Sequence, residues 1–125
     1  MLPRSIGIVG YGHFGELLHE LIERFAPQIK LRVHSSRFAP DGKVFFSLAD
    51  TAQCDAVILA VPISAFEEQL MKILPLMRPE GVIVDVATVK MHTVKALERH
   101  AAGRQYLATH PMWGRESYEK KGKQV

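Results

Sequence analysis

Three glycines near the start of the chain have the spacing of a phosphate-binding loop. Gly10, Gly12 and Gly15 follow a short apolar run, and a helical pattern of apolar residues begins directly after them. The first glycine of such a loop permits a tight turn, the second lets the backbone approach a diphosphate, and the third lets helix and strand pack closely. Free N–H groups at the start of the helix would bind the same phosphates, with His13 and Phe14 beside them. The spacing predicts a dinucleotide site.

A second group of polar residues follows the next predicted strand. Ser35, Ser36 and Arg37 occupy the position at which an NAD site normally has an Asp or Glu for the ribose hydroxyls. The next carboxylate, Asp41, comes only after Pro40. Two hydroxyls and a guanidinium suit a 2′-phosphate, so the sequence favours NADP over NAD. Alternatively, the segment is a polar loop in which Arg37 stacks on adenine without selecting the phosphate.

Two further segments are expected at the same edge of the sheet. Val61 and Pro62 end an apolar strand and are predicted to lie under the ribose and nicotinamide, although a strand end followed by a helix explains them equally well. Thr88 follows the next strand, where it either caps a helix or faces the nicotinamide. His110 follows the last strand and is held by Pro111. A neutral imidazole there could accept a proton as hydride leaves a substrate, so His110 and Thr88 are the catalytic candidates.

Strands and helices alternate along the chain without an internal repeat. The pattern predicts helices at 13–25, 64–74 and 89–101, the second with a capping box of Ser64 and Glu67, and strands at 6–9, 29–34, 43–46, 56–61, 82–86 and 105–109. This order indicates an α/β fold with a doubly wound, mostly parallel sheet, a Rossmann-like NAD(P)-binding domain. Ligands of such a sheet bind beyond the carboxyl ends of its strands.

The composition is that of an ordinary globular domain. The 125 residues carry a net charge of +3, with 47% hydrophobic and 23% charged residues, which predicts a single domain over 1–125. One cysteine, no leader and no long apolar run favour a cytoplasmic protein without a membrane segment. Much of the positive charge lies in the tail at 115–125, and we expect this tail to be an exposed basic end rather than a nucleic-acid site. We expect no metal site.

Three motifs together resemble the prephenate and arogenate dehydrogenases, nicotinamide-dependent enzymes of tyrosine biosynthesis. These are the glycine loop, Asp85-x-x-Thr88-Val89-Lys90, and His110-Pro111-Met112-Trp113-Gly114. The resemblance implies that His110 hydrogen-bonds the ring hydroxyl of arogenate or prephenate, and that Thr88 occupies a position usually held by serine. It also implies oxidative decarboxylation of that substrate, and the Ser35–Arg37 segment looks more like the NADP-using arogenate branch.

The chain also departs from the family pattern. Arg115 stands where proline is usual. The resemblance implies a helical C-terminal domain that forms the dimer and binds the substrate carboxylates, and we expect these 125 residues to lack it. We therefore expect the chain alone to bind NADP and to turn substrate over slowly or not at all, with exposed apolar surface favouring a homodimer. Two alternatives stay open. One is a hydroxyacid or imine reductase domain, and the other is a non-catalytic, regulatory nucleotide-binding module.

Overall fold

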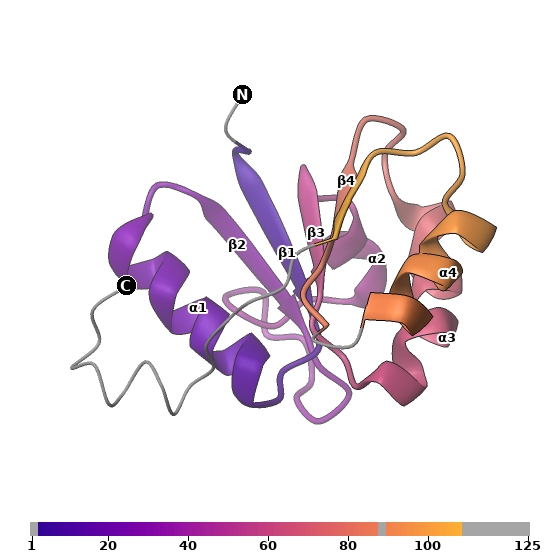
Figure 1. Ribbon diagram of the computed structural model, residues 1–125. Coiled ribbons are helices and arrows are strands. Elements are labelled where there is room, and N and C mark those ends of the chain that lie inside the picture. Colours follow the sequence, from indigo (N-terminus) through magenta and orange to yellow (C-terminus); the bar gives the residue numbers. More distant parts are fainter. Residues whose placement is uncertain (1–2, 88–89, 109–125) are drawn as a thin grey trace.

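The chain alternates strands and helices from its first residues to its last strand. The computed structural model describes residues 3–87 and 90–108 (Figure 1). The elements in chain order are β1 (Ser5–Val9), α1 (His13–Phe25), β2 (Lys30–His34), α2 (Leu48–Ala52), β3 (Ala56–Leu59), α3 (Ile63–Ile73), the 3₁₀ turn η1 (Leu74–Leu76), β4 (Val82–Asp85), α4 (Lys90–His100) and β5 (Tyr106–Ala108).

The five strands form one parallel sheet in the order β2-β1-β3-β4-β5. Their carboxyl ends therefore meet at one edge, which is the lower edge in Figure 1. The chain moves outward from β1 to β2 on one side and returns to β3 on the other. The strand order thus reverses between β1 and β3, and a crevice opens at such a reversal. The predicted α/β, Rossmann-like fold is confirmed.

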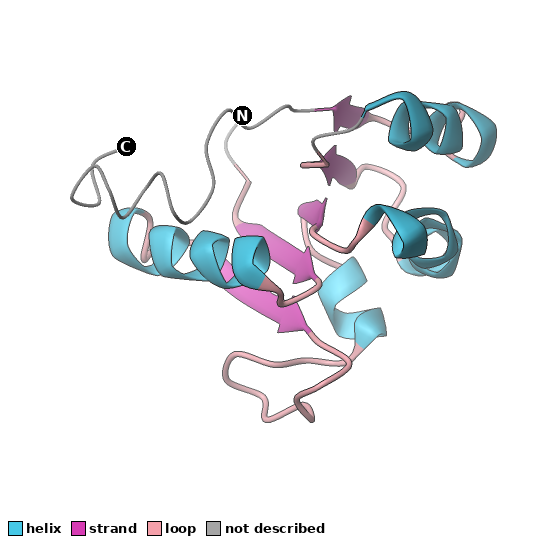
Figure 2. Cartoon of the chain, turned by 60° about the horizontal axis from the view of Figure 1, so that its bottom comes forward, coloured by secondary structure: helices cyan, strands magenta, loops and turns pink. Residues whose placement is uncertain are grey.

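Helices cover both faces of the sheet. Helix α1 lies on one face over β1 and β2, and α2, α3 and α4 lie on the other (Figure 2). The face under α2–α4 holds the larger core, in which Phe66, Leu70 and Ile73 of α3 are fully buried. Burying an apolar side chain of this size contributes about 1.5–3 kcal/mol. This packing fixes α3, and with it one wall of the crevice.

The predicted third strand at 43–46 is wrong. Phe45 forms one isolated bridge to Val33, and no ladder follows it within the described residues. The reason is Asp41, whose Oδ1 accepts the backbone N–H groups of Lys43, Val44 and Phe45 at 2.9–3.0 Å. These three hydrogen bonds lower the pKa of Asp41 and fold the segment into a turn. Of the N–H groups in the segment, that of Phe46 bonds β2, at the carbonyl of Val33 (2.8 Å).

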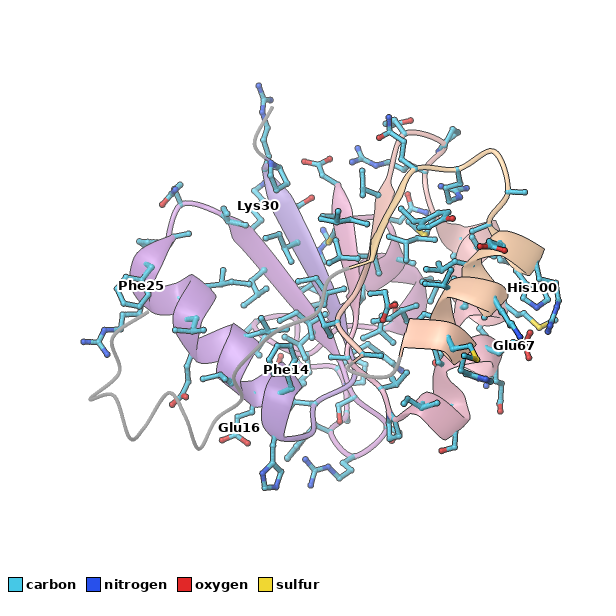
Figure 3. All side chains as sticks on the ribbon, viewed as in Figure 1. Phe14, Glu16, Phe25, Lys30, Glu67 and His100 are labelled. Atoms are coloured by element: carbon cyan, nitrogen blue, oxygen red, sulfur yellow. The ribbon has the colours of Figure 1, made fainter. Side chains whose placement is uncertain are left out.

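The predicted capping box at the start of α3 is also wrong. The helix begins at Ile63 after Pro62, no side chain caps it, and the backbone carbonyl of Pro62 accepts the N–H of Ala65 at 2.9 Å. Glu67 instead accepts hydrogen bonds from Arg99 and His100 of α4. The His100 hydrogen bond is the main cause that lowers the pKa of Glu67, and the charge of Arg99 adds to it. Figure 3 shows Glu67 and His100 side by side between the two helices.

Helix α2 was not predicted, because five residues are too few for a periodic pattern. Ser47 caps it by accepting the N–H of Asp50 at 3.1 Å. The helix lies on β1 at Gly7, where an added Cβ would come within 2.3 Å of the carbonyl oxygen of Thr51. The remaining predicted elements are present, with their ends within two residues of those observed wherever the structure describes them.

Candidate functional site

A cleft of about 920 Å³ opens at the carboxyl edge of the sheet. It is lined by residues from the ends of β1, β2, β3 and β4, from the first turn of α1 and from the first two turns of α3: Val9, Gly10, Tyr11, Gly12, His13, Phe14, His34, Ser35, Ser36, Arg37, Leu59, Ala60, Val61, Pro62, Ile63, Ala65, Gln69, Val86 and Ala87. It lies at the strand reversal between β1 and β3, the usual ligand position in this fold. The volume is that of a small-molecule site.

Two glycines of the loop are required by the fold itself. Gly10 has φ +108°, a conformation that L side chains rarely adopt, and a Cβ there would lie 2.4 Å from the carbonyl oxygen of Ala60. Its N–H donates to the carbonyl of His34 at 2.9 Å, which ties the loop to β2. A Cβ on Gly15 would lie 2.3 Å from the carbonyl oxygen of Gly10. Gly15 therefore sets how closely α1 approaches β1.

Gly12 differs from both. A Cβ at this position would meet no described atom within 4 Å, and the backbone is in an ordinary extended conformation. Gly12 is the N-cap of α1 and has no side chain to bond the free N–H groups of the first turn. These N–H groups and the positive end of the helix dipole lie at the cleft, an arrangement that favours an anion. The lack of a side chain at Gly12 leaves room for it.

The loop after β2 forms the next wall. The buried hydroxyl of Ser35 accepts the backbone N–H of Arg37 at 3.1 Å, which shapes the turn. Arg37 Nη2 donates to the carbonyl of Tyr11 at 2.8 Å, and the guanidinium lies over the Phe38 ring, 5.4 Å from its centroid. Since a guanidinium has five N–H donors, this leaves Arg37 able to bind an anion at the cleft.

Tyr11, which the sequence analysis did not single out, anchors the glycine loop. Its hydroxyl hydrogen-bonds His19 Nδ1 at 2.8 Å, and its ring packs edge-on against Phe38 and Phe45. His19 Nε2 in turn lies 3.2 Å from a carboxylate oxygen of Glu23. An aromatic residue between two glycines was the available signal, but its partners come from α1 and from the loop after β2. The result is a loop held in place by side chains outside the cleft.

The opposite wall comes from β3 and α3. Val61 and Pro62, both sequence candidates, line it together with Ile63, Ala65 and Gln69, which were not predicted. Every other predicted cofactor residue lines the cleft except Gly15, which packs beneath the loop. Phe14 lies at the start of α1, next to the strand ends (Figure 3). The far end of the cleft is formed by Val86 and Ala87.

The predicted catalytic residues Thr88 and His110 lie outside the described residues. The structure does describe Asp85, which precedes them on β4. Its carboxyl group is fully buried, its Oδ1 accepts the N–H of Ala87 at 2.8 Å, and it does not line the cleft. Asp85 pairs in register with Leu59, whose side chain belongs to the core under α3 and α4. Asp85 therefore shapes the turn after β4 from the core side of the sheet, through its hydrogen bond to Ala87.

Neither a metal cluster nor a membrane span is found in the part of the chain that the structure describes. No group of three His, Cys, Asp or Glu side chains there could hold a metal ion. No helix in the described ranges is both long and apolar enough to cross a bilayer.

Solved structures share this fold. The prephenate dehydrogenase of Aquifex aeolicus, in complex with hydroxyphenyl propionate and NAD⁺, superposes with a TM-score of 0.72 at 21% identity, covering 90% of this chain and 43% of that one. Arogenate dehydrogenase of Synechocystis gives a TM-score of 0.74 at 23% identity, covering 86% and 40% of the two chains. At these identities the likeness shows a shared fold.

One curated relative is covered to a similar extent. Cyclohexadienyl dehydrogenase of Zymomonas mobilis is 23% identical over 124 aligned residues, covering 91% of this chain but 42% of that protein. The chain thus spans less than half the length of this relative. The family model described as prephenate dehydrogenase, nucleotide-binding domain, matches residues 41–124. This range includes Thr88 and His110, whereas the glycine loop lies before it. The chain belongs to the family of the prephenate dehydrogenase nucleotide-binding domain.

Proposed function

We propose that the cleft binds a nicotinamide dinucleotide, NADP in preference to NAD, with the diphosphate at the glycine loop. The observation that carries this proposal is the cleft itself. It lies where α1 begins, and Gly12, which lines it, has no side chain and no described neighbour where a Cβ would be. A phosphate there would accept N–H groups of the first turn of α1.

The preference for NADP rests on the charge of the adenosine end. None of the described residues that line the cleft is Asp or Glu, so the carboxylate that would bind the ribose hydroxyls of NAD is missing there. Arg37 and the hydroxyls of Ser35 and Ser36 line that wall instead. A guanidinium can hold a phosphate through two parallel hydrogen bonds.

The reaction we propose is the oxidative decarboxylation of arogenate or prephenate. When bound, NADP supplies the acceptor for hydride from the hydroxyl-bearing ring carbon. His110 accepts the hydroxyl proton, and Thr88 orients that hydroxyl or the imidazole. Loss of carbon dioxide then leaves an aromatic phenol. A positioned base of this kind contributes about 100- to 10,000-fold in rate.

Two measurements on the 125-residue chain test this function. In the first, NADPH is titrated with the protein while its fluorescence is followed, and saturable binding is expected. The second is a steady-state assay with arogenate or prephenate and NADP, in which the chain alone turns over slowly or not at all. Failure to bind NADPH would contradict the proposed cofactor site, and robust turnover would contradict the need for further substrate-binding groups.

A further inference from the structure

We propose that Gln69 recognises the adenine base of the dinucleotide, through paired hydrogen bonds to its edge. The inference rests on the proposed function, because it assigns a role within the same cleft. It concerns a residue that neither the glycine loop nor the Ser35–Arg37 wall accounts for.

The position of Gln69 is fixed by its helix. Ala65 and Gln69 are four residues apart, so they share one face of α3, and both line the cleft. The adjacent residues Phe66 and Leu70 are fully buried and hold α3 on the sheet. Gln69 itself is half-buried. Its amide is therefore presented to the cleft from a rigid support.

The face that carries Gln69 is turned away from α4. Glu67 points to α4, where it meets Arg99 and His100 (Figure 3). Two residues along a helix amount to a rotation of about 200°, so Gln69 is on the opposite side. That side faces α2, which contacts α3 and packs on β1 and on β2, the strand that leads into Ser35–Arg37. Gln69 thus belongs to the Ser35–Arg37 end of the cleft, the proposed adenosine end.

The chemistry of this wall suits a base. The other residues that β3 and α3 contribute are apolar, namely Leu59, Ala60, Val61, Pro62, Ile63 and Ala65, and Gln69 carries the one polar side chain of that wall among the described residues. Apolar side chains can cover the flat face of a base, while an amide can bind its edge. Within the described part of the chain, no hydrogen bond or ion pair engages the Gln69 amide.

Glutamine matches adenine in particular. Adenine presents the N6 amino donor beside the N7 acceptor, and a glutamine amide can pair with both at once. Hypoxanthine has a carbonyl oxygen in place of the amino group, so it offers two acceptors there. A protein that reads adenine through Gln69 should bind the hypoxanthine analogue of NADP more weakly.

The experiment compares NADP with nicotinamide hypoxanthine dinucleotide phosphate on the full 125-residue chain. Both are titrated by calorimetry against wild type, Gln69→Ala, Gln69→Glu and the control Gln28→Ala, whose glutamine is exposed in the turn after α1 and lies outside the cleft. We expect wild type and Gln28→Ala to prefer the adenine form about tenfold. That preference should fall to about one in Gln69→Ala, with Gln69→Glu also binding NADP more weakly than wild type.

The outcomes separate this inference from the proposed function. If wild type binds neither dinucleotide, both the proposed function and the role of Gln69 are overturned. If wild type binds NADP but Gln69→Ala keeps the full adenine preference, or if wild type shows no preference, only the role of Gln69 falls. Circular dichroism of each variant confirms that a changed ratio comes from a folded protein.

Discussion

Arg37 Nη2 donates a 2.8 Å hydrogen bond to the backbone carbonyl of Tyr11. This contact joins the loop after β2 to the glycine loop, 26 residues earlier in the chain. The segment proposed to hold the 2′-phosphate is therefore tied directly to the one proposed to hold the diphosphate. A substitution at Arg37 removes both this tie and the proposed ligand of the 2′-phosphate, and the two effects can be separated.

Replacing Arg37 with glutamine is expected to weaken NADP binding about tenfold more than NAD binding, a difference of about 1.4 kcal/mol. Loosening the glycine loop would affect both cofactors equally because they share the diphosphate. The ratio of the two dissociation constants therefore isolates the contact with the 2′-phosphate.

Arg32→Gln is the matched control for this measurement. Like Arg37, Arg32 donates to one backbone carbonyl, that of Asp50, and lies over one phenylalanine ring, but it is outside the cleft. Its loss should leave the NADP to NAD ratio unchanged. An equal loss of affinity for both cofactors in Arg37→Gln would remove the basis for NADP selectivity.

Gly12→Ala and Gly15→Ala should have opposite effects. At Gly12 a methyl group meets no described atom within 4 Å, so the free energy of unfolding should change little while cofactor binding is lost. At Gly15 the methyl group overlaps the carbonyl oxygen of Gly10, and overpacking of this kind costs about 1–3 kcal/mol. Urea unfolding and NADPH titration of both variants would show this. A Gly12→Ala protein that binds NADPH normally would mean that the diphosphate lies elsewhere.

The link between α3 and α4 should depend on pH. Because the His100 hydrogen bond and the charge of Arg99 lower the pKa of Glu67, the unfolded chain binds its proton more readily than the folded one does. The stabilisation is therefore complete above the ordinary glutamate pKa and is lost as the pH falls through the lowered value. Glu67→Gln should be less stable than wild type at neutral pH, with the gap closing in acid. Urea unfolding at several pH values would measure it, and a gap that widens in acid would refute this role.

His110→Asn should keep the cofactor and lose the substrate contact. We expect an unchanged affinity for NADPH, about tenfold weaker binding of arogenate to the NADPH complex, and a rate at least about 100-fold lower in any assay that detects turnover. Arogenate binding to the NADPH complex can be followed by fluorescence without turnover. If arogenate binds the variant as it binds wild type, the proposed role of His110 is wrong, and a non-catalytic nucleotide-binding module gains support.

The sequence predicted what depends on local pattern. Patterns within about ten residues were enough to predict the apolar face of α1, the apolar strands β1 and β3, and the glycine loop. The residues after each strand could be assigned to one edge because a parallel sheet brings the carboxyl ends together. Of the predicted cofactor residues, the structure brings all but Gly15 around one cleft.

What the sequence did not predict depends on which side chain binds a given group, whether that side chain is near or distant in the chain. The Lys43–Phe46 segment has the residues of a strand, but Asp41 binds the N–H groups of its first three residues. The Ser64–Glu67 spacing resembles a cap, but Glu67 is engaged by α4. Tyr11 and Gln69 could not be placed at the cleft before the packing of α1 and α3 was known. The Ser47–Asp50 cap was the one local signal that could have revealed α2.

The most direct test of the central claim is a calorimetric titration of the purified chain with NADP and, separately, with NAD. The account predicts one saturable site for NADP with about tenfold weaker binding of NAD. It also predicts loss of that site in the Gly12→Ala variant, with the fold intact. Absence of saturable heat with either dinucleotide, from a protein that circular dichroism shows to be folded, would contradict it.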